Sequence, residues 1–151
     1  MVWKPHVTVA AIIEREQRFL IVEEETSNGL AFNQPAGHLE PSESLIDAVI
    51  REVNEETAWT FTPEYITSIQ LWRKHPDASS FLRVCFVGSC SDYQAKQILD
   101  DGIIATHWLT RDELAAQKSK LRSPLVLTTI DQYLAGERHP LSLLKTFLDQ
   151  E

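Results

Sequence analysis

The sequence contains little cysteine and no cluster of metal-binding histidines. Its two cysteines, Cys85 and Cys90, stand five residues apart in a strand-like segment. A regular strand directs them to opposite faces, so we do not expect them to form a disulfide bond. The histidines lack the paired spacing of zinc sites, and we interpret the scattered ones as structural or surface residues: His75, His107 and His139.

The sequence also lacks a membrane segment. No apolar run approaches the roughly 18 residues of a transmembrane helix, and the opening residues MVWKPHVTVA do not follow the pattern of a signal peptide. Together with the low cysteine content, this predicts a protein of the reducing cytoplasm without a membrane partner.

Positive charge is scarce as well. The 22 Asp and Glu residues outnumber the 14 Lys and Arg residues, which leaves a formal net charge of −8. A nucleic-acid backbone requires a basic surface that releases counterions, so we do not expect a nucleic-acid polymer as a partner. A single nucleotide bound as its metal complex is compatible with this charge, because the cation supplies the missing positive charge.

The composition is otherwise that of an ordinary globular domain. Apolar residues make up 43% of the chain and charged residues 24%, which indicates neither disorder nor a repeat array. A chain of 151 residues is long enough to enclose one core, so we predict a single domain over residues 1–151.

The stretch over residues 37–59, GHLEPSESLIDAVIREVNEETAW, carries the strongest pattern. It predicts a helix with Ser42 as N-cap after Pro41, and with Glu43 in the first turn, where the helix dipole favours an anion. Apolar side chains at helical spacing indicate one buried face. That face contains Leu45, Val49 and Val53.

Three carboxylates in the last turn of this expected helix need an explanation. Glu52 and Glu56 border the buried face and Glu55 lies beside them, although the negative end of the dipole and mutual repulsion disfavour anions there. Arg51 is one candidate to offset the charge, and its spacing places it between Asp47 and Glu55 rather than near Glu52. A divalent cation such as Mg²⁺ is the other candidate. A solvated acidic helix face is the alternative to a metal site.

The same stretch resembles the Nudix box, G-x5-E-x7-R-E-U-x-E-E-x-G-U, in which U is a bulky apolar residue. One position departs from the pattern, because Ala58 replaces the second glycine. A glycine after a helix usually adopts the left-handed conformation, so alanine there is expected to cost about 1 kcal/mol or to change the helix exit. The matching positions are Gly37, Glu43, Arg51, Glu52, Val53, Glu55, Glu56 and Trp59.

The resemblance to the Nudix hydrolase family implies an α/β fold, a Nudix-type α/β/α sandwich with a mixed β-sheet, and a Mg²⁺-dependent hydrolase in which Mn²⁺ can substitute. Outside the box the sequence is similar to the NudJ-type phosphatase branch, through KPHVTVA, NQPAGHLE, FLR and LRSPLV. This branch implies nucleoside tri- and diphosphates and related small pyrophosphates as substrates, including the thiamine pyrimidine pyrophosphate, with a metal-activated water as nucleophile. The alternatives are an ADP-ribose, nucleotide-sugar or dinucleotide pyrophosphatase, and a non-catalytic Nudix-fold binding module.

The resemblance also implies roles for the residues of the box. Glu52 and Glu56 are the implied principal metal ligands, and Glu55 is a further ligand or the base. Arg51 and Glu43 are the implied orienting partners. We expect the general base to be a glutamate of the box, Glu52 or Glu55. Candidates outside the box are Asp100 and Asp101.

Substrate contacts outside the helix are assigned from side-chain chemistry. Arg83 and Lys74 are candidates to meet phosphates, and the loop at Gly37 can present backbone amides to a phosphate. We expect a small-molecule substrate and a monomer or homodimer. The aromatic side chains considered for stacking on a base are Phe32, Trp72 and Trp108.

The remaining elements are predicted from hydrophobic pattern and turn residues. Residues 6–13 and 18–23 are expected to form a hairpin, and residues 30–37 a short strand that enters the box. Further strands are expected over residues 59–61, 65–72, 81–88 and 107–109. Helices are expected over residues 111–117 with Thr110 as N-cap, over residues 125–134 with Gly136 after the end, and over residues 141–148.

Overall fold

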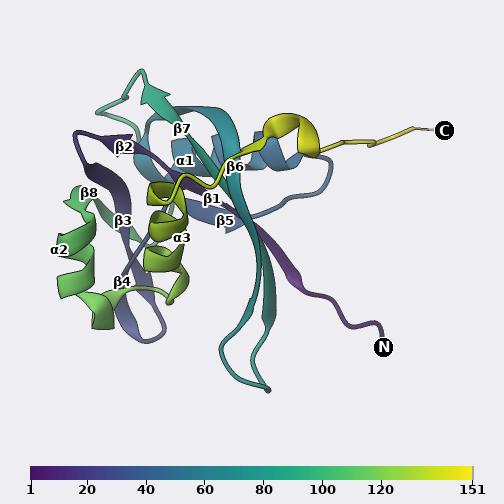
Figure 1. Ribbon diagram of the computed structural model, residues 1–151, viewed down its shortest axis with the longest axis horizontal. Coiled ribbons are helices and arrows are strands. Elements are labelled where there is room, and N and C mark those ends of the chain that lie inside the picture. The colour runs from purple at the N-terminus through teal and green to yellow at the C-terminus, as the bar shows by residue number, and fades with distance from the viewer. Residues whose placement is uncertain (151) are drawn as a thin grey trace.

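The strands form two sheets, and the larger one is mixed. The computed structural model describes residues 1–150. Its larger sheet has five strands in the order β5-β1-β7-β6-β9 (Figure 1). Strands β1 and β7 run parallel, whereas the other neighbouring pairs are antiparallel. The strands are β1 (His6–Ile12), β5 (Ala36–His38), β6 (Thr60–Arg73), β7 (Ser80–Ser91) and β9 (His139–Pro140).

The smaller sheet corrects the hairpin expected near the N-terminus. The sequence predicts that residues 6–13 pair with residues 18–23, but β2 is the hairpin partner of β3, and β1 pairs in the larger sheet. Because β1 is a nearly continuous apolar run, it takes a central position that is buried on both faces. The smaller sheet contains β2 (Glu14–Arg15), β3 (Arg18–Thr26), β4 (Gly29–Asn33) and β8 (Ile103–Thr110).

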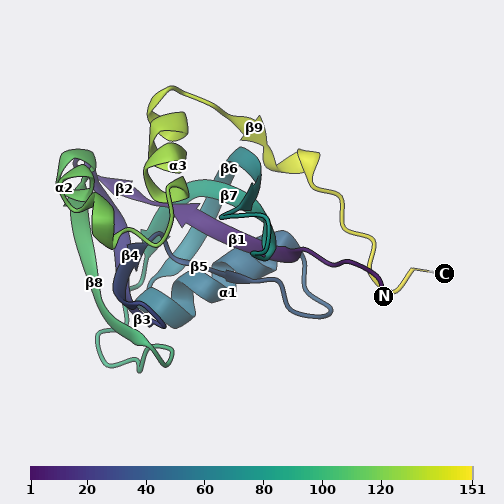
Figure 2. The ribbon, with the colours of Figure 1, turned by 90° about the horizontal axis from the view of Figure 1, so that it is seen from below.

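Helices cover both faces of the larger sheet. Helix α1 (Leu45–Thr57) lies on one face and α3 (Leu125–Leu134) on the other, as Figure 2 shows. Alternating side chains of β1 divide between them, because Val9 belongs to the apolar core under α1 and Ile12 to the core under α3. This arrangement confirms the α/β/α sandwich with a mixed sheet.

The two cysteines lie in different layers and are both free and buried. Cys85 lies beside Gln70 and Arg83 under α3, with its Sγ 3.4 Å from Arg83 Nη1. Cys90 belongs to the core under α1. The expectation that they do not pair is confirmed.

The start of α1 differs from the sequence prediction. Ser44 caps the helix, since its Oγ accepts a hydrogen bond from the Asp47 backbone N–H at 3.0 Å. Ser42 has a φ of 64°, which belongs to a turn, whereas an N-cap requires the extended backbone that Ser44 has at φ −76° and ψ 163°. Glu43 therefore precedes the helix instead of lying in its first turn.

The residue after α1 keeps the left-handed backbone conformation although it is alanine and not glycine. Ala58 has φ 63° and ψ 13°, and its N–H donates to the Asn54 carbonyl at 2.9 Å. An L-residue in this conformation costs about 1–2 kcal/mol. The helix exit is therefore unchanged, and the chain tolerates the strain.

The helices after β8 follow the prediction. Helix α2 (Arg111–Ala116) begins after Thr110, which forms a capping box with Glu113. Helix α3 ends before Gly136, whose φ is 83°. Within residues 1–150, no helix combines the length and the apolar character needed to span a membrane.

Three other predictions need correction. The single strand expected over residues 30–37 is two short strands in different sheets, β4 and β5. The strands expected over residues 59–61 and 65–72 are one strand, β6, because register shifts beside Pro63 accommodate the proline within the pair with β7. The helix expected over residues 141–148 is only a 3₁₀ turn, Leu141–Leu143. Leu141 and Leu144 pack on the core under α1 but Phe147 is 75% exposed, so this apolar spacing does not create a helical face.

The two serines before α1 provide a stability test. Ser44→Ala removes the acceptor for the Asp47 N–H and should lower the free energy of unfolding by about 1 kcal/mol. Ser42→Ala is the matched control and should change it by less than about 0.5 kcal/mol. Urea unfolding of both variants measures the difference. A larger loss for Ser42→Ala would contradict the assigned cap.

Candidate functional site

The last two turns of α1 face strand β5. Glu52 packs directly on Gly37, and a Cβ added to Gly37 would collide with the Glu52 carboxylate. A side chain at Gly37 would therefore displace this carboxylate, which is 8% exposed, from its present position. The first glycine of the box and its second glutamate form one packing unit.

The Arg51 guanidinium gathers several acceptors around it. It donates to the two carboxylate oxygens of Glu43 at 2.7 and 3.0 Å. It also donates to Glu52 at 2.8 Å and to Glu55 at 3.1 Å, and to the His38 carbonyl at 3.0 Å. The expectation that Arg51 lies away from Glu52 was therefore wrong. The long side chain spans the angle that separates adjacent residues on the helix.

Glu43 faces Arg51 from outside the helix. Hydrogen bonds from Arg51 lower the pKa of the Glu43 carboxyl, and Glu43 in turn raises the pKa of Arg51. Glu43 Oε1 also accepts the Glu40 backbone N–H at 2.8 Å, which fixes the carboxylate on the loop before α1. This ion pair holds the guanidinium in place beside the glutamates of the last turns.

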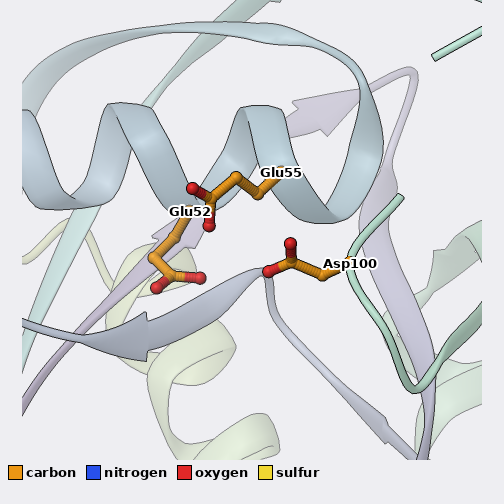
Figure 3. Close-up of side chains that lie close together, drawn as sticks. All are labelled: Glu52, Glu55 and Asp100. Atoms are coloured by element: carbon orange, nitrogen blue, oxygen red, sulfur yellow. The ribbon is translucent and has the colours of Figure 1, made fainter. Parts of the chain in front are cut away.

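Glu52 and Glu55 converge with Asp100 in a cluster that fits a metal ion. One carboxylate oxygen of each residue lies within 4.8 Å of the other two. Figure 3 shows Glu52 and Glu55 extending from α1, with Asp100 facing them from another segment of the chain. Hard divalent cations prefer such carboxylate oxygens, so the donor set suits a cation of this class.

The segment that carries Asp100 is fastened to the end of α1. The Asp100 N–H donates to the Glu55 carbonyl at 2.9 Å, and the Gln97 side chain donates to the Asn54 carbonyl at 2.7 Å. Carbonyls at a helix end lack partners within the helix, and here the following segment supplies donors for them. Asp100 therefore joins the cluster, whereas Asp101 lies exposed in the next turn.

Glu56 lies beside the cluster as its most buried neighbour. It is 7% exposed, and its Oε1 accepts the Ala36 backbone N–H at 2.8 Å. Burial above all raises the pKa of Glu56 to about 9, against the opposing effect of the Ala36 hydrogen bond, and the Glu52 and Glu24 carboxylates add to the rise. Metal binding requires a deprotonated carboxylate, so a cation that Glu56 helped to bind would have to displace its proton.

The two glutamates of the cluster are also shifted toward the neutral form. Burial is the main cause of the raised pKa values of both Glu52 and Glu55. The hydrogen bond from Arg51 opposes the rise at Glu52, whereas Asp100 adds to the rise at Glu55. Carboxyl groups shifted in this way gain from a bound cation and accept a proton more readily than an ordinary exposed carboxylate.

A cavity of about 520 Å³ adjoins the carboxylates at β5. Gly37, Arg83 and Lys74 all line it, and so does Trp72. The structure therefore brings four of the six candidate substrate contacts to one cavity. Because Gly37 also touches Glu52, it joins the cavity to the carboxylate cluster.

The other proposed aromatic contacts lie elsewhere. Phe32 is 8% exposed and lines a smaller cavity of about 310 Å³. Trp108 packs edge-on against Trp59, and the Arg15 guanidinium lies over both rings. These side chains are placed in the interior packing and not on the larger cavity.

Several cavity residues escaped the sequence reasoning. They come from separate elements, and strand register brings them together, so no local motif identifies them. Asp100 was named from the sequence as an acid just before an expected strand, and it belongs to the carboxylate cluster and not to the cavity lining. The cavity residues that were missed include Asn33, His38, Phe81 and Arg122.

Comparison with known proteins gives one consistent family. The family model described as the NUDIX domain matches residues 4–128. The Phosphatase NudJ of Escherichia coli (strain K12) is 39% identical over 145 residues, which span 96% of this chain and 94% of that protein.

Solved structures show the same similarity. A NUDIX hydrolase from Nitrosomonas europaea is 42% identical, with a TM-score of 0.94 and coverage of 97% of this chain and 100% of that chain. The NUDIX domain of Shewanella oneidensis NrtR, complexed with ADP ribose, has a TM-score of 0.70 and covers 89% of each chain. At 20% identity that second similarity concerns the fold alone.

The raised pKa of Glu56 predicts a pH-dependent stability of the metal-free protein. The pKa rises from 4.5 to about 9 on folding, so the stability that protonated Glu56 provides is complete below pH 4.5 and is lost as the pH rises toward about 9. Glu56→Gln should therefore make the protein more stable in EDTA at pH 8, by about 1–3 kcal/mol. Urea unfolding at pH 5 and pH 8 measures the change.

A matched substitution separates this effect from a general change of charge. The exposed Glu64 on β6 serves as the control, and Glu64→Gln should leave the pH dependence unchanged. Adding a divalent cation should remove the advantage of Glu56→Gln, because the unmutated protein then gains binding energy. Lower stability of Glu56→Gln in EDTA at pH 8 would contradict the burial argument.

Proposed function

The chain belongs to the Nudix hydrolase family, and from this premise we propose that it hydrolyses phosphoanhydride bonds of nucleoside tri- and diphosphates and related small pyrophosphates. The reaction depends on Mg²⁺, for which Mn²⁺ can substitute. The observation that supports this proposal is the convergence of Glu52, Glu55 and Asp100 beside a cavity that also touches Gly37.

The carboxylates of the last turns of α1 would hold the cation. We assign Glu52, Glu55 and Glu56 as ligands, as the box implies, and add Asp100 because its oxygen faces the first two. When bound, Mg²⁺ neutralises phosphate oxygens and lowers the pKa of a coordinated water. Arg51, held by Glu43 on the far side, keeps two of these carboxylates in position.

Glu55 is our candidate for the general base, with Glu52 as the alternative. The Glu55 side chain is 39% exposed and can reach a water molecule, whereas Glu52 is packed against Gly37. A water that attacks phosphorus must lose a proton, and the raised pKa of Glu55 suits it to accept one. The bond from phosphorus to the leaving phosphate oxygen then breaks, with no protein nucleophile.

The cavity would hold the rest of the substrate. Gly37, Arg83 and Lys74 line it and are our substrate-binding residues there. Phe32 stays a weaker candidate, since it lines the smaller cavity. The similarity to NudJ phosphatases supports nucleotides and small pyrophosphates such as the thiamine pyrimidine pyrophosphate as the class to test.

The charge of the chain bears on the partners that we propose for it. With a net charge of −8, the protein offers little to a nucleic-acid polymer or an anionic membrane. We place it in the cytoplasm, acting on small molecules as a monomer or homodimer.

Substitution of the cluster tests the enzyme assignment. Glu52→Gln and Glu56→Gln should each lower kcat for Mg²⁺-dependent phosphate release by about 10²–10⁴-fold, because each removes a charged ligand or base. Glu64→Gln is the matched control on an exposed strand position and should keep full activity. Unchanged activity of Glu52→Gln or Glu56→Gln would show that the assignment is wrong.

A substrate panel in ¹⁸O-labelled water identifies the reaction. We expect ¹⁸O in a phosphate product from nucleoside di- or triphosphates, and phosphate and pyrophosphate scored separately report which phosphorus is attacked. Turnover of ADP-ribose, nucleotide sugars or dinucleotides alone would transfer the assignment to that class. Tight binding of a ligand without hydrolysis of any panel member would indicate a non-catalytic module.

A further inference from the structure

Two histidines that stand 32 residues apart in the sequence meet at the edge of the larger sheet. Register pairs Thr8 of β1 with His38 of β5, and His6 lies two residues before Thr8. Side chains two residues apart on a strand share a face, so His6 and His38 are diagonal neighbours on that face. His6 Nδ1 and His38 Nε2 are 3.0 Å apart. Strand pairing thus creates an imidazole pair that no local motif contains.

The orientation of the pair is set by its contacts. The His6 ring stacks on Phe81 of the neighbouring strand β7, with ring centroids 4.9 Å apart and an interplanar angle of 19°. The two imidazoles stand nearly edge to face, at an angle of 73°. Within residues 1–150, neither imidazole has a further hydrogen-bond partner. One nitrogen of each ring is therefore directed at the other ring, and both side chains are exposed to a ligand from solvent.

The pair lies on the opposite face of β5 from the carboxylate cluster. A Cβ added to Gly37 would meet the Glu52 carboxylate, so this position of β5 faces α1. His38 is the next residue, and successive side chains of a strand point to opposite faces. Among the described residues, the cavity lining includes His38 but none of the three carboxylates of the cluster. A cation held by the imidazoles would therefore be separate from one held by the carboxylates.

Imidazole nitrogens prefer a different class of cation from carboxylate oxygens. Imidazole suits Zn²⁺, Cu²⁺ and Ni²⁺, whereas Mg²⁺ prefers oxygen ligands. Two imidazole nitrogens on one tetrahedral Zn²⁺, each about 2.0–2.1 Å from it, are roughly 3.3 Å apart. The separation of 3.0 Å between His6 and His38 is close to that value. A small rotation of two exposed side chains is enough to direct both nitrogens at one ion.

Metal binding requires both imidazoles to be neutral, with the binding nitrogens unprotonated. Partial burial, and then the neighbouring His6, lower the pKa of His38. This shift favours the neutral ring. A neutral ring that donates the hydrogen bond between the pair can carry its proton on the other nitrogen instead. A cation can therefore take the place of that hydrogen bond without removing a proton from the pair.

The pair leaves coordination positions of a cation vacant. Within residues 1–150, no carboxylate, thiol or other imidazole completes a set of three ligands around it. Because His38 lines the cavity, the vacant positions would be accessible from this space. Zinc sites with fewer than four protein ligands are completed by water or by a bound molecule.

We propose that His6 and His38 form a metal site of their own, which binds a transition-metal ion such as Zn²⁺, Ni²⁺ or Cu²⁺. Water or an oxyanion from the cavity supplies the remaining ligands. This site goes beyond the proposed hydrolysis, and it does not depend on that function. Its cation differs from the Mg²⁺ of the carboxylate cluster in chemical class and in the face of β5 on which it lies.

Zinc titration of the full-length, untagged protein tests the pair without relying on turnover. Calorimetry in excess Mg²⁺ measures the dissociation constant of Zn²⁺. We expect His6→Asn and His38→Asn each to weaken Zn²⁺ binding by about 10-fold or more, since loss of an outer partner of a ligand already costs about 10–100-fold. In the unmutated protein, the imidazole ¹⁵N resonances of both histidines should shift together as Zn²⁺ is added.

Two control variants separate this site from others. His75→Asn removes an exposed histidine from the loop between β6 and β7, and it should leave the dissociation constant unchanged. Glu52→Gln removes a carboxylate of the cluster, and the resonances of His6 and His38 should still respond to Zn²⁺.

Three results would overturn the proposal. The first is Zn²⁺ binding by both Asn variants as tight as that of the unmutated protein. The second is a Zn²⁺-induced shift confined to one of the two imidazoles, which would indicate contact with a single histidine. The third is loss of Zn²⁺ binding only in Glu52→Gln, which would place the ion at the carboxylates. A failure of hydrolysis in the ¹⁸O panel would contradict the proposed function and leave the zinc result unaffected.

Discussion

The ion pair between Arg51 and the acids around it is the interaction on which the site depends. Carboxylates at the C-terminal end of a helix repel one another and the helix dipole. Arg51 offsets this by binding Glu52 and Glu55 on the helix, while Glu43 holds its other edge from the preceding loop. The guanidinium also donates to the carbonyl of His38, so the same cation ties α1 to β5. The carboxylates that we propose as cation ligands on α1 are thereby held in one geometry by a side chain of the protein itself.

Burial changes the charge of one of these acids, because it raises the pKa of Glu56. Arg51 contacts the outer glutamates, whereas Glu56 lies deeper and meets the backbone of Ala36. The outer acids are stabilised by a permanent cation, and the inner one is neutral near physiological pH because its pKa lies near 9. If Glu56 joins the cluster in binding a cation, as we propose, the site keeps a neutral inner acid without metal and gains a further carboxylate when the cation displaces its proton. The helix end can therefore carry several acids without losing stability, because the most buried one is neutral and the others are paired with Arg51.

The sequence predicted those parts of the molecule that depend on local spacing. The box identified the acids of α1 and Arg51, and the α/β/α architecture followed from the family resemblance and the apolar pattern. The cap at Ser42 was wrong because two serines fit the same motif, and only the turn decided between them. Asp100 was one of two acids named outside the box, and only the structure distinguishes it from Asp101, whereas Phe81 and Arg122 of the cavity could not be identified in advance. Both depend on which segments of the chain become neighbours, which no local pattern encodes.

The attachment of the Asp100 segment to the end of α1 affects how the sequence can vary. The backbone N–H of Asp100 binds the carbonyl of Glu55, and Gln97 binds that of Asn54. The third acid of the cluster is therefore positioned by the helix terminus together with the residues that lead up to it. The connection from β7 is attached there as well, because the Gln94 N–H donates to the Ala58 carbonyl at 3.0 Å and the Tyr93 ring packs against Trp59. A change that frays the last turn of α1 would displace acids on two separate segments at once.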